Sequence, residues 1–186
     1  MKASACAKLT RRPLTGHWFR ALRLKHWTTR LSSSHSAISP SRFSSATPTK
    51  PRHRIVYLGE NHQVAIHEVG ALLGDPSAPV SNPKGSWAIL SFEVILNQIV
   101  DLTDSTQQKI ISTNTSELNG NWVNASGVSP TQELGDSLFG LLGLEGFLFN
   151  SSKVKAKGLA IFPEKLGSSS AVKLINEITM KTELLD

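Results

Sequence analysis

The hydrophobic pattern of the chain predicts several short strands and few helices. Runs rich in β-branched and aromatic residues, bounded by Gly, Pro or polar clusters, are typical of strands. The predicted strands cover residues 54–58, 87–96, 99–102, 146–149 and 158–162. Residues 17–27 fit a strand or a short helix, and residues 171–178 fit a last helix or an edge strand.

Two segments carry clear signals for the start of a helix. Asn61 can cap a helix that runs to about Leu73. In Ser129-Pro-Thr-Gln132 the serine can cap, the proline suits the first helical position, and the glutamine can close a capping box; this helix is expected to end near Gly143. Residues 103–111 predict a further helix. Because strands and helices do not alternate regularly, we expect a single α+β domain with a mixed sheet.

The remaining segments are predicted to lack regular structure. Residues 1–16 are interpreted as a flexible, basic N-terminus. Residues 28–49 contain eight serines and no helical or strand period, so they predict a loop. Residues 112–128 form a second predicted loop, with Trp122 as its large anchor. A loop longer than about 15 residues inside a small domain is usually functional or disordered.

The composition excludes several classes of protein. A chain of 186 residues that is 39% hydrophobic and 18% charged suits one packed domain and is neither wholly disordered nor collagen-like. The chain contains no run of about 18 apolar residues, so it predicts no membrane-spanning helix. The single cysteine, Cys6, excludes a disulfide framework and a zinc site built on several thiolates. We expect a cytoplasmic protein without a membrane partner.

The charge is distributed unevenly along the chain. Residues 1–54 hold 12 of the 20 Lys and Arg residues and none of the 14 Asp and Glu residues. A basic leader without acidic residues fits nucleic-acid contact, a membrane-surface arm, an organellar transit peptide or a site for an anionic ligand. Composition alone leaves these alternatives open.

Glu68 is the most informative candidate for chemistry. It lies between Val64 and Leu72 within the apolar stripe of the predicted helix. An unpaired buried carboxylate is costly, so it needs a partner or a cavity. Glu68 therefore either lines a cleft and stabilises a cation, or lies at the edge of the stripe with its head group in water; spacing alone favours the second interpretation.

Three further residues are candidates for a binding site. Tyr57, the single tyrosine, ends the strand before this helix and either stacks on a planar ligand or fills the core. Arg42 stands among serines and can clamp a phosphate, although a solvated arginine is the commoner case. Ser151 and Ser152 follow a hydrophobic strand and alone indicate only a turn.

Known motifs for nucleotide loops, nucleophile elbows and zinc proteases are absent from the sequence. His62 and His67 lack a convincing third ligand, so we expect no metal site.

Taken in order, short motifs along most of the chain resemble the RES domain family, which is named for an Arg, a Glu and a Ser. Each motif is weak, but their order and spacing are specific. They are His17-Trp-Phe-Arg-Ala21, Ser41-Arg-Phe43, Val56-Tyr-Leu58, Ala65-Ile-His-Glu-Val69, Val100-Asp-Leu-Thr-Asp104, Trp122, Pro130-Thr-Gln132, Leu144-Glu-Gly146, Phe149-Asn-Ser-Ser152 and Leu159-Ala-Ile-Phe-Pro163. The resemblance implies a RES domain over residues 17–180.

The resemblance assigns the family's residues to Arg42, Tyr57, Glu68 and Ser151. Tyr57 and Glu68 are eleven positions apart, as in the family, whereas the fifteen positions between Arg42 and Tyr57 exceed the usual gap. Arg52 and Arg54 are therefore alternatives for the arginine. Asn150 stands where a Pro commonly precedes the family serine, so Ser152 is an alternative for the serine.

The resemblance implies an ADP-ribosyltransferase-like fold that binds NAD in a cleft as its substrate, with no further cofactor. Glu68 would stabilise an oxocarbenium-like sugar, Arg42 would hold the pyrophosphate, Tyr57 would pack against the nicotinamide ribose or ring, and Ser151 would bond the nicotinamide end. The acceptor would be water or phosphate. This reading explains the basic leader and the serine-rich loop better than a transit peptide does.

The resemblance also implies a toxin with an antitoxin partner. The expected antitoxin is a helix-turn-helix protein of the Xre type, which plugs the cleft with its C-terminal segment. A protein ADP-ribosyltransferase and a basic nucleic-acid-binding module that uses residues 1–54 are the alternatives. The second is disfavoured because no nucleic-acid-binding motif is present and the rest of the chain is acidic.

Overall fold

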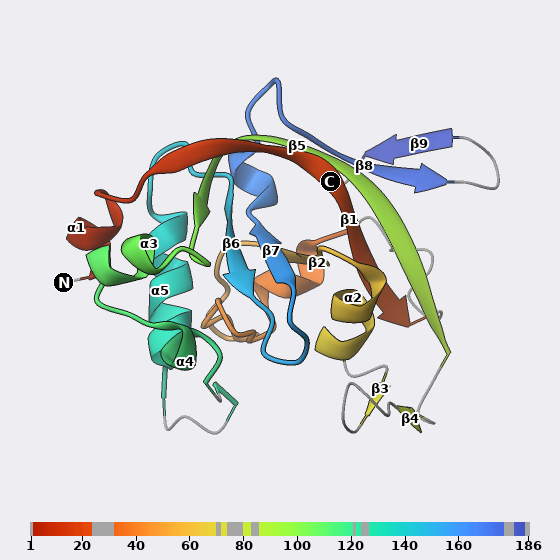
Figure 1. The fold of residues 1–186 in the computed structure, drawn as a ribbon, viewed down its shortest axis with the longest axis horizontal. Helices are drawn as coiled ribbons and strands as arrows, with labels where there is room; N and C mark the ends of the chain where they lie inside the picture. The colour runs from red at the N-terminus through yellow and green to blue at the C-terminus, as the bar shows by residue number, and fades with distance from the viewer. Residues whose placement is uncertain are drawn as a thin grey trace.

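Two long antiparallel strands arch over the molecule and organise the rest of the fold (Figure 1). The computed structural model describes residues 2–23, 32–69, 72–73, 80–82, 86–120, 122–123, 127–176 and 181–184. Strand β1, Arg11–Arg23, pairs with β5, Trp87–Asp101, in a register that runs from Arg11 opposite Val100 to Arg23 opposite Trp87. A register shift between Arg12 and Leu14 interrupts this ladder once.

The sheet closes on itself because β1 pairs with β2, Val56–Gly59, as well as with β5. From β2 the ring continues through β7, Lys157–Ile161, and β6, Gly146–Asn150, to β5. The β5–β6 pairing is parallel, and the other pairings in this ring are antiparallel. The predicted single α+β domain with a mixed, largely antiparallel sheet is confirmed, and the sheet is barrel-like.

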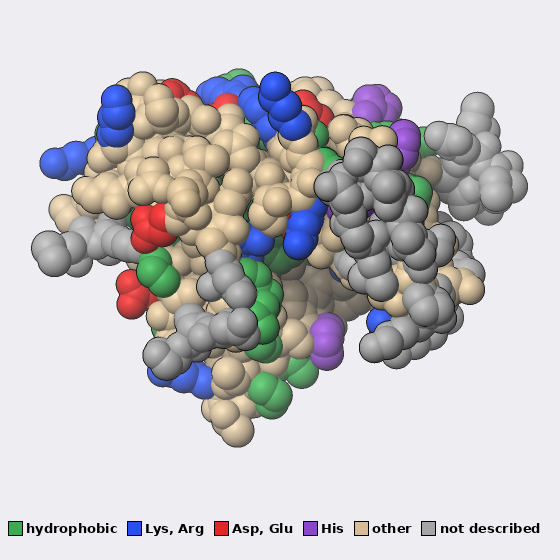
Figure 2. Space-filling view, turned by 60° about the horizontal axis from the view of Figure 1, so that its bottom comes forward, with side chains coloured by type: hydrophobic (Ala, Val, Ile, Leu, Met, Phe, Trp, Pro, Cys, Tyr) green, Lys and Arg blue, Asp and Glu red, His purple; other side chains and the backbone are tan. Residues whose placement is uncertain are grey.

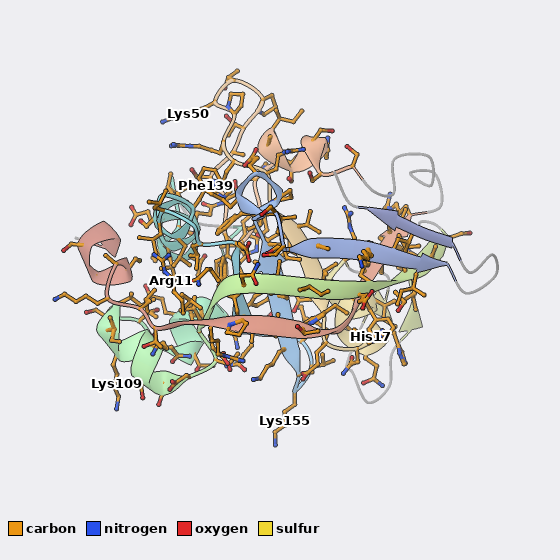
Figure 3. All side chains as sticks on the ribbon, turned by 90° about the horizontal axis from the view of Figure 1, so that it is seen from above. Arg11, His17, Lys50, Lys109, Phe139 and Lys155 are labelled. Atoms are coloured by element: carbon orange, nitrogen blue, oxygen red, sulfur yellow. The ribbon has the colours of Figure 1, made fainter. Side chains whose placement is uncertain are left out.

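Further strands extend the sheet beyond the ring. Strand β8, Ala171–Asn176, pairs with β5 and with β9, Lys181–Leu184. Seen from above, β1, β5 and β8 lie side by side across the molecule (Figure 3). The short pair β3, Leu72–Leu73, and β4, Val80–Ser81, forms a separate ribbon.

Helices cover the two ends of the ring, as Figure 1 shows. At one end lie α1, Lys2–Cys6; α3, Ser105–Ile110; α4, Thr115–Leu118; and α5, Pro130–Phe139. At the other end α2, His62–Glu68, packs against β1 and β2. No helix in the described part of the chain is long and apolar enough to span a membrane.

The alternating pattern of β6 divides the core into two clusters. Phe147 and Phe149 pack with Phe43, Leu134 and the other apolar residues of the helical end. Leu148, between them, belongs to the second cluster inside the ring, which also contains Trp18, Leu22, Val56, Leu58, Phe92, Val94, Leu159 and Ile161. Side chains alternate between the two faces of a strand, so β6 supplies both clusters and is buried on both faces.

The buried carboxylate of Glu145 accepts backbone hydrogen bonds where β5 changes its partner strand. One edge of β5 pairs with β8 at residues 91–95 and with β6 at residues 99–101, which leaves Asn97 and Gln98 between the two ladders. The backbone N–H groups of both residues donate to Oε2 of Glu145. The other oxygen of this carboxylate accepts from Gly167 N and Ser170 Oγ. Glu145 is only 2% exposed, so it replaces the missing strand partner inside the core.

Several predicted boundaries differ from the structure. The polar pair Asn97-Gln98 suggested two strands over residues 87–102, whereas β5 is continuous because Glu145 satisfies this pair. The segment 171–176 is a strand with partners on both sides. The short helix α4 lies inside the predicted loop 112–128. The capping box of α5 is confirmed, but this helix ends at Phe139 with Gly140 as its C-cap.

Within the predicted flexible N-terminus, residues 1–16, the described residues include regular structure. Residues 2–6 form α1 and residue 11 begins β1. Cys6 and Leu9 are buried in the helical cluster of the core, which fixes this segment. The strand also accounts for the predicted strand or helix at residues 17–27, of which residues 24–27 lie outside the described part.

Replacing Glu145 with alanine is expected to lower the free energy of unfolding by about 3 kcal/mol, because several buried donors lose their acceptor. Chemical denaturation followed by circular dichroism measures this change. Glu164→Ala is the control, because the Glu164 side chain is 34% exposed and its pair with Arg54 contributes about 1 kcal/mol or less. Equal, small effects of both substitutions would show that Glu145 is not a structural anchor.

Candidate active site

A pocket of about 900 Å³ opens beside α2 and β2. Its walls come from β1, β2, α2, the serine-rich segment 32–42, the chain after α4, and the turn after β6. This volume lies within the range of small-molecule sites. Figure 2 shows the molecule from the side of the bottom of Figure 1, where basic and hydrophobic side chains border a hollow.

The loop that carries Arg42 is fixed against α5. Gln132 Nε2 donates to the carbonyl oxygens of Ser41 and Ser44. The same glutamine closes the capping box of α5, so one side chain ties the helix start to the loop. Gly135, one turn further along, lies so close that a Cβ there would overlap the Phe43 carbonyl oxygen. The loop can lie on α5 only because this residue has no side chain.

Tyr57 secures the same loop from β2. Its hydroxyl accepts from Phe43 N at 3.2 Å and lies 2.8 Å from Ser41 Oγ. Burial raises the pKa of the Tyr57 phenol above its ordinary value, because desolvation disfavours the ionised form. The Tyr57 side chain therefore fixes the residues on either side of Arg42, while the residue also lines the pocket.

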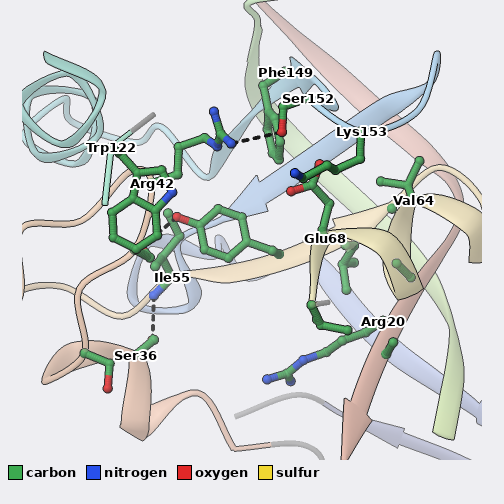
Figure 4. A pocket seen from close by; sticks show the side chains of 18 of the residues that line it. Arg20, Ser36, Arg42, Ile55, Val64, Glu68, Trp122, Phe149, Ser152 and Lys153 are labelled. Carbon is green, nitrogen blue, oxygen red and sulfur yellow. Dashed lines mark hydrogen bonds between the residues drawn. The ribbon is translucent and has the colours of Figure 1, made fainter. Parts of the chain in front are cut away.

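The Arg42 guanidinium is held by oxygen atoms that carry no formal charge. Its Nη1 donates to Leu118 O at 2.8 Å and approaches Gly120 O at 3.4 Å, and its Nη2 donates to Ser152 Oγ at 3.0 Å (Figure 4). In the part of the chain that the structure describes, no carboxylate forms an ion pair with Arg42. Its positive charge is thus oriented but not neutralised.

Glu68 is the last residue of α2, which begins at the predicted cap Asn61. The helix is shorter than predicted, since Val69 is its C-cap and residues 72–73 form β3; the predicted helix residues 70–71 lie outside the described part. Val64, Ala65 and His67 are buried, whereas Glu68 lines the pocket with an exposed side chain. The Glu68 carboxylate therefore lies at the edge of the apolar stripe of α2, and its exposed side faces the pocket.

The two serines after β6 divide their contacts between these charged groups. Ser151 is buried and donates to Glu68 Oε1 at 2.5 Å. Ser152 lines the pocket and accepts from Arg42. Both of the alternatives for the serine therefore lie at the site, with different partners. Arg52 and Arg54 do not line the pocket, and Arg54 instead pairs with Glu164.

Arg20 is a charged group of the pocket that the sequence did not indicate. It lies on β1 and lines the wall together with Lys153 from the turn after β6 (Figure 4). Desolvation by burial lowers the pKa of Arg20, but an arginine remains charged at neutral pH. Arg20, Arg42 and Lys153 outnumber the single carboxylate of Glu68 in the described lining, so the pocket favours an anionic ligand. The motif His17–Ala21 contains Arg20, but nothing in the motif indicates that the Arg20 side chain faces a pocket.

The histidines considered as metal ligands have other surroundings. His62 packs edge-on against Phe19, and His67 is buried on α2. Among the described residues, no group of three or more His, Cys, Asp and Glu side chains could hold a metal ion.

One solved structure is similar to this chain in fold. A chain of the crystal structure of the M. tuberculosis MbcT–MbcA toxin–antitoxin complex superposes with a TM-score of 0.68 at 13% sequence identity. The match covers 99% of this chain and 91% of that chain. No curated protein sequence matches the chain significantly.

The family model of the RES domain matches residues 17–181. This match spans every residue of the pocket wall described above. The chain therefore belongs to the RES domain family.

Proposed function

We propose that this protein is an NAD-consuming toxin that cleaves the bond between nicotinamide and ribose, with water or inorganic phosphate as the acceptor. The observation that carries this proposal is the pairing of Glu68 and Arg42 through adjacent serines on one pocket wall. Membership of the RES family supports the toxin role. The barrel-like, mixed sheet suits an ADP-ribosyltransferase-like fold.

The reaction breaks the bond from C1′ of the ribose to the ring nitrogen. The electron pair stays on that nitrogen, so nicotinamide leaves neutral and the sugar becomes oxocarbenium-like. An oxygen of the acceptor then bonds to C1′, and water or phosphate releases its proton. The leaving group is already a cationic pyridinium, so orientation and stabilisation of the sugar cation are the contributions left to the protein.

Glu68 suits the stabilising role because its carboxylate faces the pocket and accepts a short hydrogen bond from Ser151. This bond fixes the direction of the carboxylate before substrate arrives. It also favours a role for Ser151 in orienting Glu68, in place of the direct contact with nicotinamide that the resemblance implied.

Arg42 suits the binding of the pyrophosphate. Its contacts are with carbonyl and hydroxyl oxygens, which orient the guanidinium without cancelling its charge. Charge-assisted bonds from a guanidinium to phosphate are among the stronger hydrogen bonds in proteins. The half-buried Trp122 and the ring of Tyr57 offer aromatic surface for the planar parts of NAD.

A partner that blocks the pocket follows from the toxin role, since uncontrolled loss of NAD in the cytoplasm is lethal. We infer an Xre-type helix-turn-helix antitoxin, and the similarity to a chain from a toxin–antitoxin complex supports an antitoxin. Cells expressing this chain alone should stop growing, and cells that also express the adjacent reading frame should grow. Equal growth in both cases, with active enzyme, would count against the partner.

Glu68→Gln should lower the rate of nicotinamide release by a factor on the order of 10² to 10³, because the amide keeps the size but removes the charge. The unfolding free energy should change little, because Glu68 is exposed to the pocket. The assay follows nicotinamide release from NAD by chromatography, with and without inorganic phosphate.

Two outcomes of this assay separate the alternatives. No nicotinamide release by the folded wild-type protein, with either acceptor, rejects the proposed reaction. Transfer of label from NAD to a protein band, without free ADP-ribose or its phosphate, indicates a protein ADP-ribosyltransferase.

Arg42→Ala should raise the KM for NAD by at least about tenfold, because the pyrophosphate loses a charge-assisted contact. Arg52→Ala and Arg54→Ala are matched controls from the same stretch of chain, and neither residue lines the pocket. Steady-state kinetics of the three variants decide which arginine binds substrate. A larger effect at Arg52 or Arg54 would contradict the assignment of Arg42.

A further inference from the structure

The turn after β6 presents two adjacent hydroxyl groups with different hydrogen-bonding capacity. A serine hydroxyl has one proton to donate and two lone pairs to accept with. Ser151 Oγ donates to Glu68 and accepts from the backbone N–H groups of Lys153 and Val154, at 3.1 and 3.3 Å. Its capacity is therefore filled by the protein itself.

Ser152 is in a different position. Its Oγ accepts from Arg42 Nη2 at 3.0 Å, and none of the described residues accepts its own proton. The residue is half-buried and lines the pocket. The proton of Ser152 is thus available to a ligand in the pocket, next to a guanidinium whose charge no described carboxylate neutralises.

We propose that Ser152 and Arg42 form one anion-binding unit, in which Ser152 both positions the guanidinium and donates its own hydrogen bond to a phosphate oxygen of the ligand. This inference rests on the proposed function, and it names the group within the same pocket that recognises the pyrophosphate. The two serines then have separate tasks: Ser151 orients the carboxylate that stabilises the sugar, and Ser152 completes the site for the phosphates.

The geometry of Arg42 explains why the position of Ser152 matters. Nη1 is anchored by carbonyl oxygens near the end of α4, whereas Ser152 is the partner of Nη2. Without the Ser152 hydroxyl the guanidinium can rotate about its remaining anchor. A planar, bidentate donor depends on its orientation for binding phosphate, so such rotation weakens binding.

The adjacent serines Ser151 and Ser152 also link Glu68 and Arg42 to the same turn of the chain. Both lie directly after β6, whose ladder with β7 continues to Asn150 opposite Lys157. The backbone N–H of Ser151 donates to Ala156 O, which closes the turn below the two hydroxyls. Figure 3 shows the Lys155 side chain pointing outward from the tip of this hairpin. Glu68 and Arg42 come from distant segments, and both bond to serines of the same β6–β7 hairpin.

Kinetics and direct binding of ADP-ribose test this division of tasks. ADP-ribose carries the pyrophosphate without the nicotinamide, so calorimetry with it measures binding of the phosphate-containing part of NAD independently of the nicotinamide end. Ser152→Ala should raise both the KM for NAD and the Kd for ADP-ribose by about tenfold, with a much smaller change in kcat. Ser151→Ala should lower kcat by about tenfold or more and leave the Kd for ADP-ribose unchanged.

Matched variants control for folding and for loss of volume. Ser152→Thr keeps the hydroxyl and should restore KM and Kd to near the wild-type values. Ser152→Cys keeps the size but bonds weakly, and should behave like Ser152→Ala. Thermal unfolding of each variant identifies any that fail to fold, and the threonine and cysteine variants then carry the comparison.

The outcomes distinguish this inference from the proposed reaction. An unchanged Kd for ADP-ribose in Ser152→Ala, or a wild-type protein that does not bind ADP-ribose, overturns the anion-binding unit. Wild-type protein that binds ADP-ribose through Ser152 but releases no nicotinamide supports the unit and rejects the reaction. Equal effects of the two alanine substitutions on kcat and KM overturn the separation of tasks.

Discussion

The fold depends on how one edge of strand β5 forms backbone hydrogen bonds with two different strands, β8 and β6. Between its ladder with β8 and its ladder with β6, the N–H groups of Asn97 and Gln98 would be buried without an acceptor. The Glu145 carboxylate meets both of them and also receives Gly167 and Ser170. Because buried backbone donors must be paired, this contact sets where β6 begins, and the length of β6 then sets where Ser151 and Ser152 lie.

The site keeps opposite charges near one another without letting them neutralise each other. A direct ion pair between Glu68 and Arg42 would remove the field that each can exert on a ligand. Each charged group instead bonds a serine hydroxyl, Arg42 to Ser152 and Glu68 to Ser151, and these bonds orient both side chains. Electrostatic groups fixed before the ligand arrives cost no reorganisation when charge develops in a transition state, which suits the proposed reaction.

Local signals in the sequence predicted the elements that local interactions decide. The capping box at Ser129 and the cap at Asn61 were predictable because each lies within a few residues of its partner. The task of Glu145 was not predictable, since its partners come from segments 47 residues before it and 22 residues after it. The candidate residues of the pocket came from the family resemblance; composition alone favoured a solvated Arg42 and a core Tyr57.

Tyr57 gives the protein an internal optical reporter. The chain has one tyrosine, and its hydroxyl bonds the loop on both sides of Arg42. Burial raises the pKa of this phenol, so in the closed loop it stays neutral above pH 10, where an exposed tyrosine ionises. Tyrosinate absorbance at about pH 11 would therefore report exposure of the Tyr57 hydroxyl when the Arg42 loop moves away, without any attached label.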